Sequence, residues 1–153
     1  VAGTEVGINE PVPTFSSLFG EPFMPCDPMV YARMLGERLA RGLTRAYLIN
    51  TGWVGGSYGT GHRIELAYTR AMVTAALDGS IEHTEYVHSD ILNLDIPSTC
   101  PGVPGSILLP WQSWPSASLY NETAHELARM FQENFDRKYA HLPQDIRAAG
   151  PRG

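Results

Sequence analysis

Residues 45–66 read RAYLINTGWVGGSYGTGHRIEL, and this stretch decides the expected fold. Its first part, residues 45–50, is short, apolar and β-prone, which predicts a buried strand. Residues 51–62 hold five glycines, so a long glycine-rich loop is expected directly after that strand. A buried strand preceded by a helix and a tight link is typical of an α/β unit.

The helix is predicted on the N-terminal side, over residues 27–42. Asp27 is a good N-cap, Pro28 suits the first helical position, and Gly42 supplies a C-terminal stop. Apolar residues recur between them at helical spacing: Tyr31, Met34, Leu35 and Leu39. Residues 1–26 are rich in glycine and proline yet carry several large apolar side chains, which favours an irregular lid or binding loop.

On the C-terminal side, residues 63–66 are expected to form a brief strand, residues 69–77 a helix and residues 82–87 an edge strand. Small and apolar residues give that helix its packing side: Ala71, Met72, Ala75 and Ala76. Five prolines in residues 89–115 predict an irregular connection.

The strongest periodic pattern predicts a long helix over residues 116–140, followed by a polar tail at 141–153. Its apolar residues fall on one face of a helix: Tyr120, Ala124, Leu127, Ala128, Phe131 and Phe135. The intervening glutamates and arginines point elsewhere, which is the pattern of a helix with one packed face.

Composition excludes several classes of protein. The net charge is −5, and no basic run is present, which argues against nucleic acid as a partner. No apolar stretch reaches the roughly 18 residues that cross a bilayer, and the first residues lack the regions of a signal peptide. Cys26 and Cys100 are too few for a disulfide framework, so we expect buried free thiols, no membrane association and a cytoplasmic location.

The glycine loop has part of the pattern of a phosphate-binding P-loop. Gly56 and Gly61 have the required spacing, but His62 and Arg63 stand where that motif needs Lys and Ser or Thr. The hydroxyl that would bind Mg²⁺ is therefore missing, and we do not predict a P-loop. The five histidines show no H-E-x-x-H or related spacing, so no catalytic residue and no metal ligand is predicted.

The amino-acid sequence around the glycine-rich loop resembles that of a known family. The string YLINTGWVGGSYGTGHRI at residues 47–64, followed by YTRAM at 68–72, resembles the C-terminal portion of ATP-dependent phosphoenolpyruvate carboxykinase. The likeness continues through residues 3–11, 19–24 and 100–104 and into the late helix. The resemblance implies an α/β fold: the C-terminal part of that family's nucleotide-binding domain, with a mixed sheet, flanking helices and long loops.

This family converts oxaloacetate and ATP into phosphoenolpyruvate, ADP and CO₂ in gluconeogenesis, with Mg²⁺ and Mn²⁺. The resemblance implies that Arg63, Ile64 and Thr69 contact the adenosine end of ATP. Their chemistry suits this role, since a guanidinium can stack on a purine, Ile gives an apolar wall and a hydroxyl can hydrogen-bond. The family usually has Lys where this chain has His62, so ATP binding here is expected to weaken as the histidine loses its charge.

The resemblance also implies a domain plan and an incomplete site. A lid-like region occupies 1–26, an α/β core with the adenine-site loop 27–88, an irregular connection 89–115, a helix 116–140 and a tail 141–153. The family's P-loop, metal ligands and oxaloacetate-binding arginines lie upstream of this part, so we expect a C-terminal fragment that is inactive alone. Two alternatives stay open: a stand-alone module that binds adenine nucleotides without catalysis, and a partial gene product without an independent role.

Overall fold

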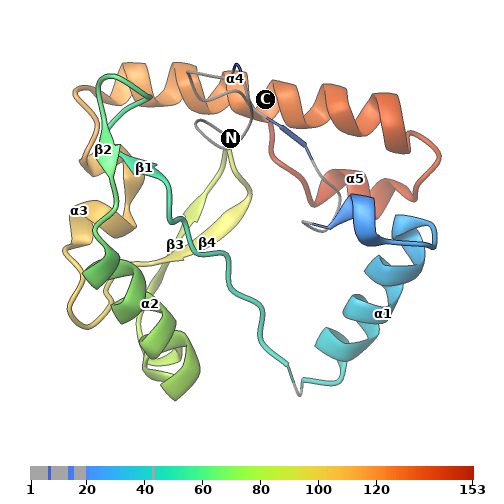
Figure 1. The fold of residues 1–153 in the computed structure, drawn as a ribbon, viewed down its shortest axis with the longest axis horizontal. Helices are drawn as coiled ribbons and strands as arrows, with labels where there is room; N and C mark the ends of the chain where they lie inside the picture. The colour runs from blue at the N-terminus through green and yellow to red at the C-terminus, as the bar shows by residue number, and fades with distance from the viewer. Residues whose placement is uncertain (1–6, 8–13, 16–19, 43) are drawn as a thin grey trace. The chain divides into compact units, whose positions relative to one another are not determined.

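The structure is a computed structural model that describes residues 7, 14–15, 20–42 and 44–153. The chain divides into two compact units, residues 1–48 and residues 49–153, and each is described by itself (Figure 1). Most of the expected lid, including residues 3–6 and 8–11, lies outside the described residues. Helices combined with small antiparallel sheets agree with the predicted α/β class.

The described part of the first unit contains the short 3₁₀ helix η2 (Glu21–Phe23) and helix α1 (Pro28–Ala40). The Asp27 carboxylate accepts a hydrogen bond from the Met29 backbone N–H at 2.8 Å, and Gly42 has φ +68°, as a C-terminal stop requires. The predicted helix is therefore confirmed. Met34, Leu35 and Leu39 of its apolar face are exposed.

The strand predicted over residues 45–50 is wrong, because residues 44–52 have no regular structure. Apolar, β-prone residues form a strand only where a neighbouring strand satisfies their backbone groups. Asn50 turns the chain at this point: its side-chain oxygen accepts from the Gly52 N–H at 2.9 Å, and its amide donates to the Trp53 carbonyl at 3.2 Å. Pairing starts only after this turn.

The second unit begins with strands β1 (Trp53–Val54) and β2 (His62–Arg63), which pair as an antiparallel hairpin. Helix α2 (Leu66–Asp78) follows and ends at Gly79 with φ +78°. It starts three residues earlier than predicted, so the expected strand at 63–66 is reduced to its first residue. Ala75 is buried and Ala71, Met72 and Ala76 are half-buried, which confirms the predicted packing side.

Strands β3 (Tyr86–Ser89) and β4 (Leu94–Pro97) form a second antiparallel hairpin. The strand predicted at 82–87 is displaced because residues Ser80–His83 form the 3₁₀ helix η3. The Asp78 carboxylate starts that turn by accepting from the Ser80 N–H at 2.9 Å.

The irregular connection predicted over residues 89–115 is also partly wrong. It holds β4, helix α3 (Gly105–Leu108) and the 3₁₀ helix η4 (Pro110–Gln112). Three of its five prolines lie at the edges of these elements: Pro97 ends β4, Pro104 precedes α3 and Pro110 opens η4. Proline is tolerated at such positions, where its missing N–H has no partner to lose.

Helix α4 (Ala117–Tyr139) confirms the predicted long helix. The Ser116 hydroxyl caps it by accepting from the Leu119 N–H at 3.2 Å. Of the predicted face, Tyr120, Ala124 and Ala128 are buried, whereas Leu127 and Phe131 are exposed. Trp111 and Trp114 pack edge-on against Tyr120 with ring centroids 6.2 and 5.7 Å away, and they close the core around the start of α4.

Residues 141–153, which were predicted to be a polar tail, contain a short helix. Helix α5 (Gln144–Ala148) is held by Arg147, which donates two hydrogen bonds of 2.8 Å to the Asp136 carboxylate on α4. The chain then reaches the β3–β4 turn, where the Arg152 N–H donates to the Ile91 carbonyl at 2.7 Å and the Asn93 amide to the Ala149 carbonyl at 2.9 Å.

The cysteine prediction is half correct. Cys100 is buried, but Cys26 is exposed. Burial raises the pKa of the Cys100 thiol, and the negative charge of Asp78 raises it further. Among the described residues, no helix is both long enough and apolar enough to cross a membrane.

Candidate functional site

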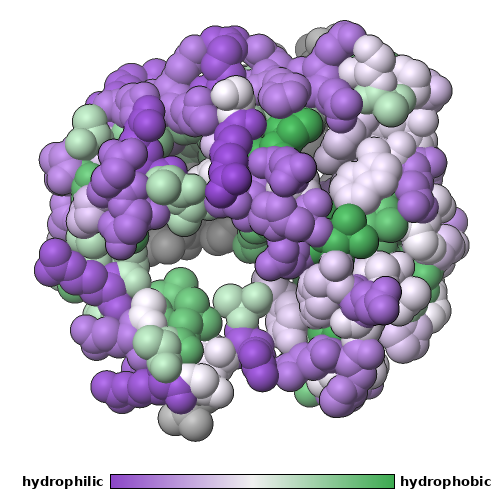
Figure 2. Space-filling view, turned by 180° about the vertical axis from the view of Figure 1, so that it is seen from behind, coloured by the Kyte–Doolittle hydropathy of each residue, from purple (hydrophilic) through white to green (hydrophobic). Residues whose placement is uncertain are grey.

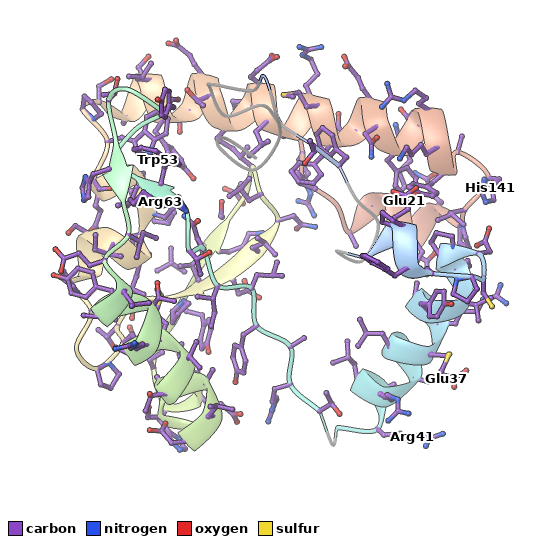
Figure 3. The ribbon with its side chains drawn as sticks, viewed as in Figure 1. Glu21, Glu37, Arg41, Trp53, Arg63 and His141 are labelled. Atoms are coloured by element: carbon purple, nitrogen blue, oxygen red, sulfur yellow. The ribbon has the colours of Figure 1, made fainter. Side chains whose placement is uncertain are left out.

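The glycine-rich segment forms the loop of the β1–β2 hairpin. Trp53 pairs with Arg63 and Val54 pairs with His62, so both ends of the loop are fixed by one antiparallel ladder. Figure 3 labels Trp53 and Arg63 on the two paired strands. The Ile64 N–H extends the ladder by donating to the Gly52 carbonyl at 2.9 Å.

The loop is closed by its own backbone. The Ser57 carbonyl accepts hydrogen bonds from the N–H groups of Thr60 and Gly61, at 3.0 and 2.8 Å. A Cβ atom on Gly61 would collide with the Gly56 carbonyl oxygen and would lie 2.7 Å from that of Val54. The glycines thus permit close approach between the two arms of a hairpin, whereas a P-loop joins a strand to a helix and cradles phosphate.

The three residues that the family resemblance assigned to adenosine lie close together in the sequence, between the end of this hairpin and the first turn of α2. Arg63 is exposed on β2, Ile64 is half-buried directly after it, and Thr69 is half-buried in the first turn of α2. Within the described part of the chain, the Arg63 guanidinium has no hydrogen bond or ion pair. A free cation, an apolar side chain and a hydroxyl are therefore present on a short segment that the hairpin and the helix hold at both ends.

Trp53 is a residue that the sequence analysis did not place at this site. Directly opposed residues of an antiparallel pair point to the same face, so the indole and the Arg63 side chain share one face of the hairpin. The Trp53 ring also packs edge-on against Tyr58, with centroids 5.3 Å apart. Two aromatic residues inside a glycine-rich loop were the available signal, because aromatic rings in such a loop supply flat apolar surface.

His62 lies on the other side of the strand from Arg63, because successive residues of a strand point to opposite faces. His62 is exposed, and its ring lies close to Gly55. A Cβ atom placed on Gly55 would lie 3.7 Å from the Cε1 and Nδ1 atoms of His62. Its predicted effect on ATP binding stays a prediction.

Apart from the hairpin, a recess of about 340 Å³ lies between the β3–β4 turn and the start of α4. Its lining residues are His88, Ser89, Asp90, Ile91, Trp111, Tyr120 and Asn121. At its rim, His88 Nδ1 lies 2.8 Å from an oxygen of Asp95. Among the described residues, no three His, Cys, Asp or Glu side chains come together as a metal site would require.

Comparison with known proteins identifies the family. Residues 1–106 match the family model described as phosphoenolpyruvate carboxykinase. Proteins named phosphoenolpyruvate carboxykinase (ATP) are 59% identical over 99% of this chain in Fusobacterium nucleatum, 52% over 100% in Caldanaerobacter subterraneus and 46% over 99% in Thermus thermophilus. The chain spans 29% of the length of each of these relatives. It therefore belongs to the phosphoenolpyruvate carboxykinase family.

Proposed function

We propose that this chain is a part of an ATP-dependent phosphoenolpyruvate carboxykinase and supplies its contacts to adenosine. The complete enzyme would convert oxaloacetate and ATP into phosphoenolpyruvate, ADP and CO₂, and it would therefore be a decarboxylating lyase. We propose that it acts in the cytoplasm. The observation that carries the proposal is the 59% identity, over nearly the whole chain, to a relative that is named for this activity.

Arg63, Ile64 and Thr69 would hold the nucleoside. The Arg63 guanidinium is exposed and has no partner among the described side chains, so it can stack on a purine ring at no cost to an existing ion pair. The half-buried Ile64 gives an apolar wall, and the Thr69 hydroxyl can donate to or accept from the base or ribose. Trp53 extends the face of the hairpin that carries Arg63.

The remaining chemistry would come from polypeptide outside this chain. Phosphoryl transfer depends on groups that position phosphates and divalent cations. The described residues contain no cluster that fits Mg²⁺ or Mn²⁺, and the glycine loop is a closed hairpin. We therefore assign the metal, phosphate and oxaloacetate contacts to the rest of the enzyme and expect this chain alone to show no turnover.

A stand-alone module that binds adenine nucleotides without catalysis is the alternative. The comparisons favour the first function, since the relatives carry the name of the enzyme and extend far beyond this segment. ATP titration of the isolated chain separates the two. A module would bind ATP at micromolar concentration, whereas a part of a larger site is expected to bind it weakly.

The decisive experiment uses a hybrid enzyme in which this chain replaces the matching segment of the Fusobacterium nucleatum relative. We expect ATP-dependent formation of phosphoenolpyruvate by the hybrid. Arg63→Ala and Thr69→Ala should each raise the KM for ATP by the equivalent of about 1–3 kcal/mol, the scale of a lost stacked cation or hydrogen bond.

Arg137→Ala is the matched control, because it removes the same charge from the exposed side of α4, where Arg137 contacts Asn134. Its KM for ATP should equal that of the unmodified hybrid. Unchanged KM values in the Arg63 and Thr69 variants would remove both residues from the nucleotide site.

A further inference from the structure

Helix α2 carries apolar residues on two opposite sides, although the exposed Arg70 lies within the outer row, between Leu66 and Val73. Its inner side packs through Ala71 and Ala75, and Ala75 is only 2% exposed. The outer side carries three large apolar residues spaced at i, i+7 and i+11, and these are Leu66, Val73 and Leu77. Their exposed fractions are 62%, 39% and 84%. We call Leu66, Val73 and Leu77 the outer face of α2.

A helix at the surface of a folded protein normally shows one apolar and one polar side. A helix that is apolar on both sides belongs between two packed layers. In α4, by contrast, residues on the side away from the core include the ion-paired Glu126, Arg129 and Glu133. Figure 2 shows that hydrophobic groups reach the molecular surface in several places. The outer face of α2 has the composition of an interface.

The position of this face indicates what covers it. Leu66 is the first residue of α2 and lies in sequence between Arg63 and Thr69, the two polar adenosine contacts of the proposed function. Adenosine and triphosphate are parts of one molecule. The polypeptide that grips the phosphates must therefore come within one nucleotide length of the start of α2.

We infer that the outer face of α2 is the docking surface for the polypeptide that carries the phosphate- and metal-binding groups of the carboxykinase. The relatives are more than three times as long as this chain, so they contain enough additional polypeptide to form such a layer. The identity of the partner rests on the proposed function, whereas the need for an apolar partner rests on α2 itself.

Cysteine labelling tests this contact. Leu77→Cys is introduced into the isolated chain and into the hybrid enzyme, and its reaction with a maleimide is followed by mass spectrometry of its peptide. In the isolated chain it should react as fast as the exposed native Cys26, while the buried native Cys100 stays protected. In the hybrid we expect the reaction at position 77 to slow by about tenfold or more, because labelling then requires the interface to open.

Equal labelling rates at position 77 in the two proteins would overturn the inference. Turnover of ATP by the same hybrid reports on the proposed function separately. An active hybrid with fast labelling refutes the docking surface and leaves the proposed function standing. An inactive hybrid with slow labelling refutes the proposed function and leaves the docking surface standing.

A second variant tests whether another occupant covers the face. Leu66→Asp with Leu77→Asp in the isolated chain should lower the binding of a hydrophobic dye and leave the thermal midpoint within a few degrees, since neither side chain contributes to the core of this unit. Unfolding of this double variant would show that the chain covers the face itself. A dimer of the unmodified chain that the double variant abolishes would show that a second copy covers it. Either result contradicts the inference.

Discussion

Trp53 and Arg63 face each other across the β1–β2 hairpin, as a directly opposed pair in its antiparallel ladder. The pair places a flat aromatic surface beside a guanidinium that has no ion pair among the described residues. Tyr58, from the loop, packs edge-on against the same indole at 5.3 Å. The position of Arg63 thus depends on the hairpin as a whole.

Shortening Trp53 should therefore weaken nucleotide binding. In the hybrid enzyme, Trp53→Ala is expected to raise the KM for ATP by the equivalent of about 0.5–1.5 kcal/mol, the range of one aromatic contact, with little change in kcat. Trp53→Phe keeps a flat ring and should retain most of the affinity. A fall in kcat at saturating ATP, with KM unchanged, would place Trp53 outside the nucleotide site.

Gly61 should tolerate no side chain. Gly61→Ala brings a methyl group against the carbonyls of Gly56 and Val54, so it should lower the free energy of unfolding by about 1–3 kcal/mol, as overpacking does. Gly36→Ala is the control, because nothing lies within 4 Å of a Cβ atom at this position inside α1. It should stabilise α1 by about 0.5–1 kcal/mol, and urea denaturation with hydrogen exchange measures both effects. Equal stability of Gly61→Ala and the unmodified chain would contradict the close approach.

The two native thiols should differ in reactivity. Cys26 is exposed, whereas Cys100 is buried and its pKa is raised by burial and by the charge of Asp78. A raised pKa means less thiolate at a given pH, and the thiolate is the reactive form. A thiol reagent at pH 8 should therefore modify Cys26 in the native protein and Cys100 only after unfolding. Cys26→Ser leaves the native protein unreactive in this prediction, so rapid labelling of that variant would disprove it.

The hydroxyl of Tyr120 should be dispensable for stability. Its oxygen is buried and has no hydrogen-bond partner among the described residues. Burial raises the pKa of Tyr120, and Ser89 opposes this shift from nearby without meeting hydrogen-bond geometry. Since an unsatisfied buried polar group is unfavourable, Tyr120→Phe should leave the free energy of unfolding unchanged or higher, whereas Tyr120→Ala should lower it by about 3 kcal/mol. A loss of more than about 1 kcal/mol in Tyr120→Phe would reveal a hydrogen bond, by the usual scale of one.

Acid should release helix α5 from α4. The hydrogen bonds donated by the Arg147 guanidinium hold the pKa of Asp136 below its ordinary value of 3.8. A lowered pKa stabilises the folded state above that ordinary value, and the contribution is lost as the pH falls below it. Hydrogen exchange of residues 144–148 should thus be constant from pH 7 to 5, after correction for intrinsic rates, and rise below pH 4.

Asp136→Asn serves as the control, because it should raise exchange in this segment at every pH and remove the added acid response. High salt should weaken the protection as well, since the pair is exposed and therefore screened. Protection that is equal in the variant and the unmodified chain would show that α5 is held by other contacts.

The sequence predicted the elements that local chemistry determines. Asp27 caps α1 as its residue type predicted, and the spacing of Tyr120, Ala124 and Ala128 identified the packed side of α4. Short strands were harder to predict, because pairing decides them. Residues 45–50 have strand propensity without a partner, whereas β4 lies in a proline-rich segment and pairs with β3.

In the candidate site, too, the residues that depend on strand pairing could not be predicted from local sequence. Arg63, Ile64 and Thr69 came from the family resemblance, and their contact with adenosine stays a prediction until the hybrid is assayed. Trp53 was missed because its relation to Arg63 is a cross-strand pairing over ten positions, and this register depends on the shape of the loop. No local pattern of residue types reports that shape.

Glycine in a loop often serves backbone flexibility, whereas in the β1–β2 loop it serves close packing of the backbone. Its glycines let backbone atoms pack where side chains would not fit, and the Ser57 carbonyl fastens the turn through two hydrogen bonds. If the proposed function holds, ATP meets a loop whose backbone is already closed by hydrogen bonds, so little conformational entropy of the loop is lost on binding. Nucleotide capture is then expected to proceed at the rate of encounter, without a slow rearrangement of this loop.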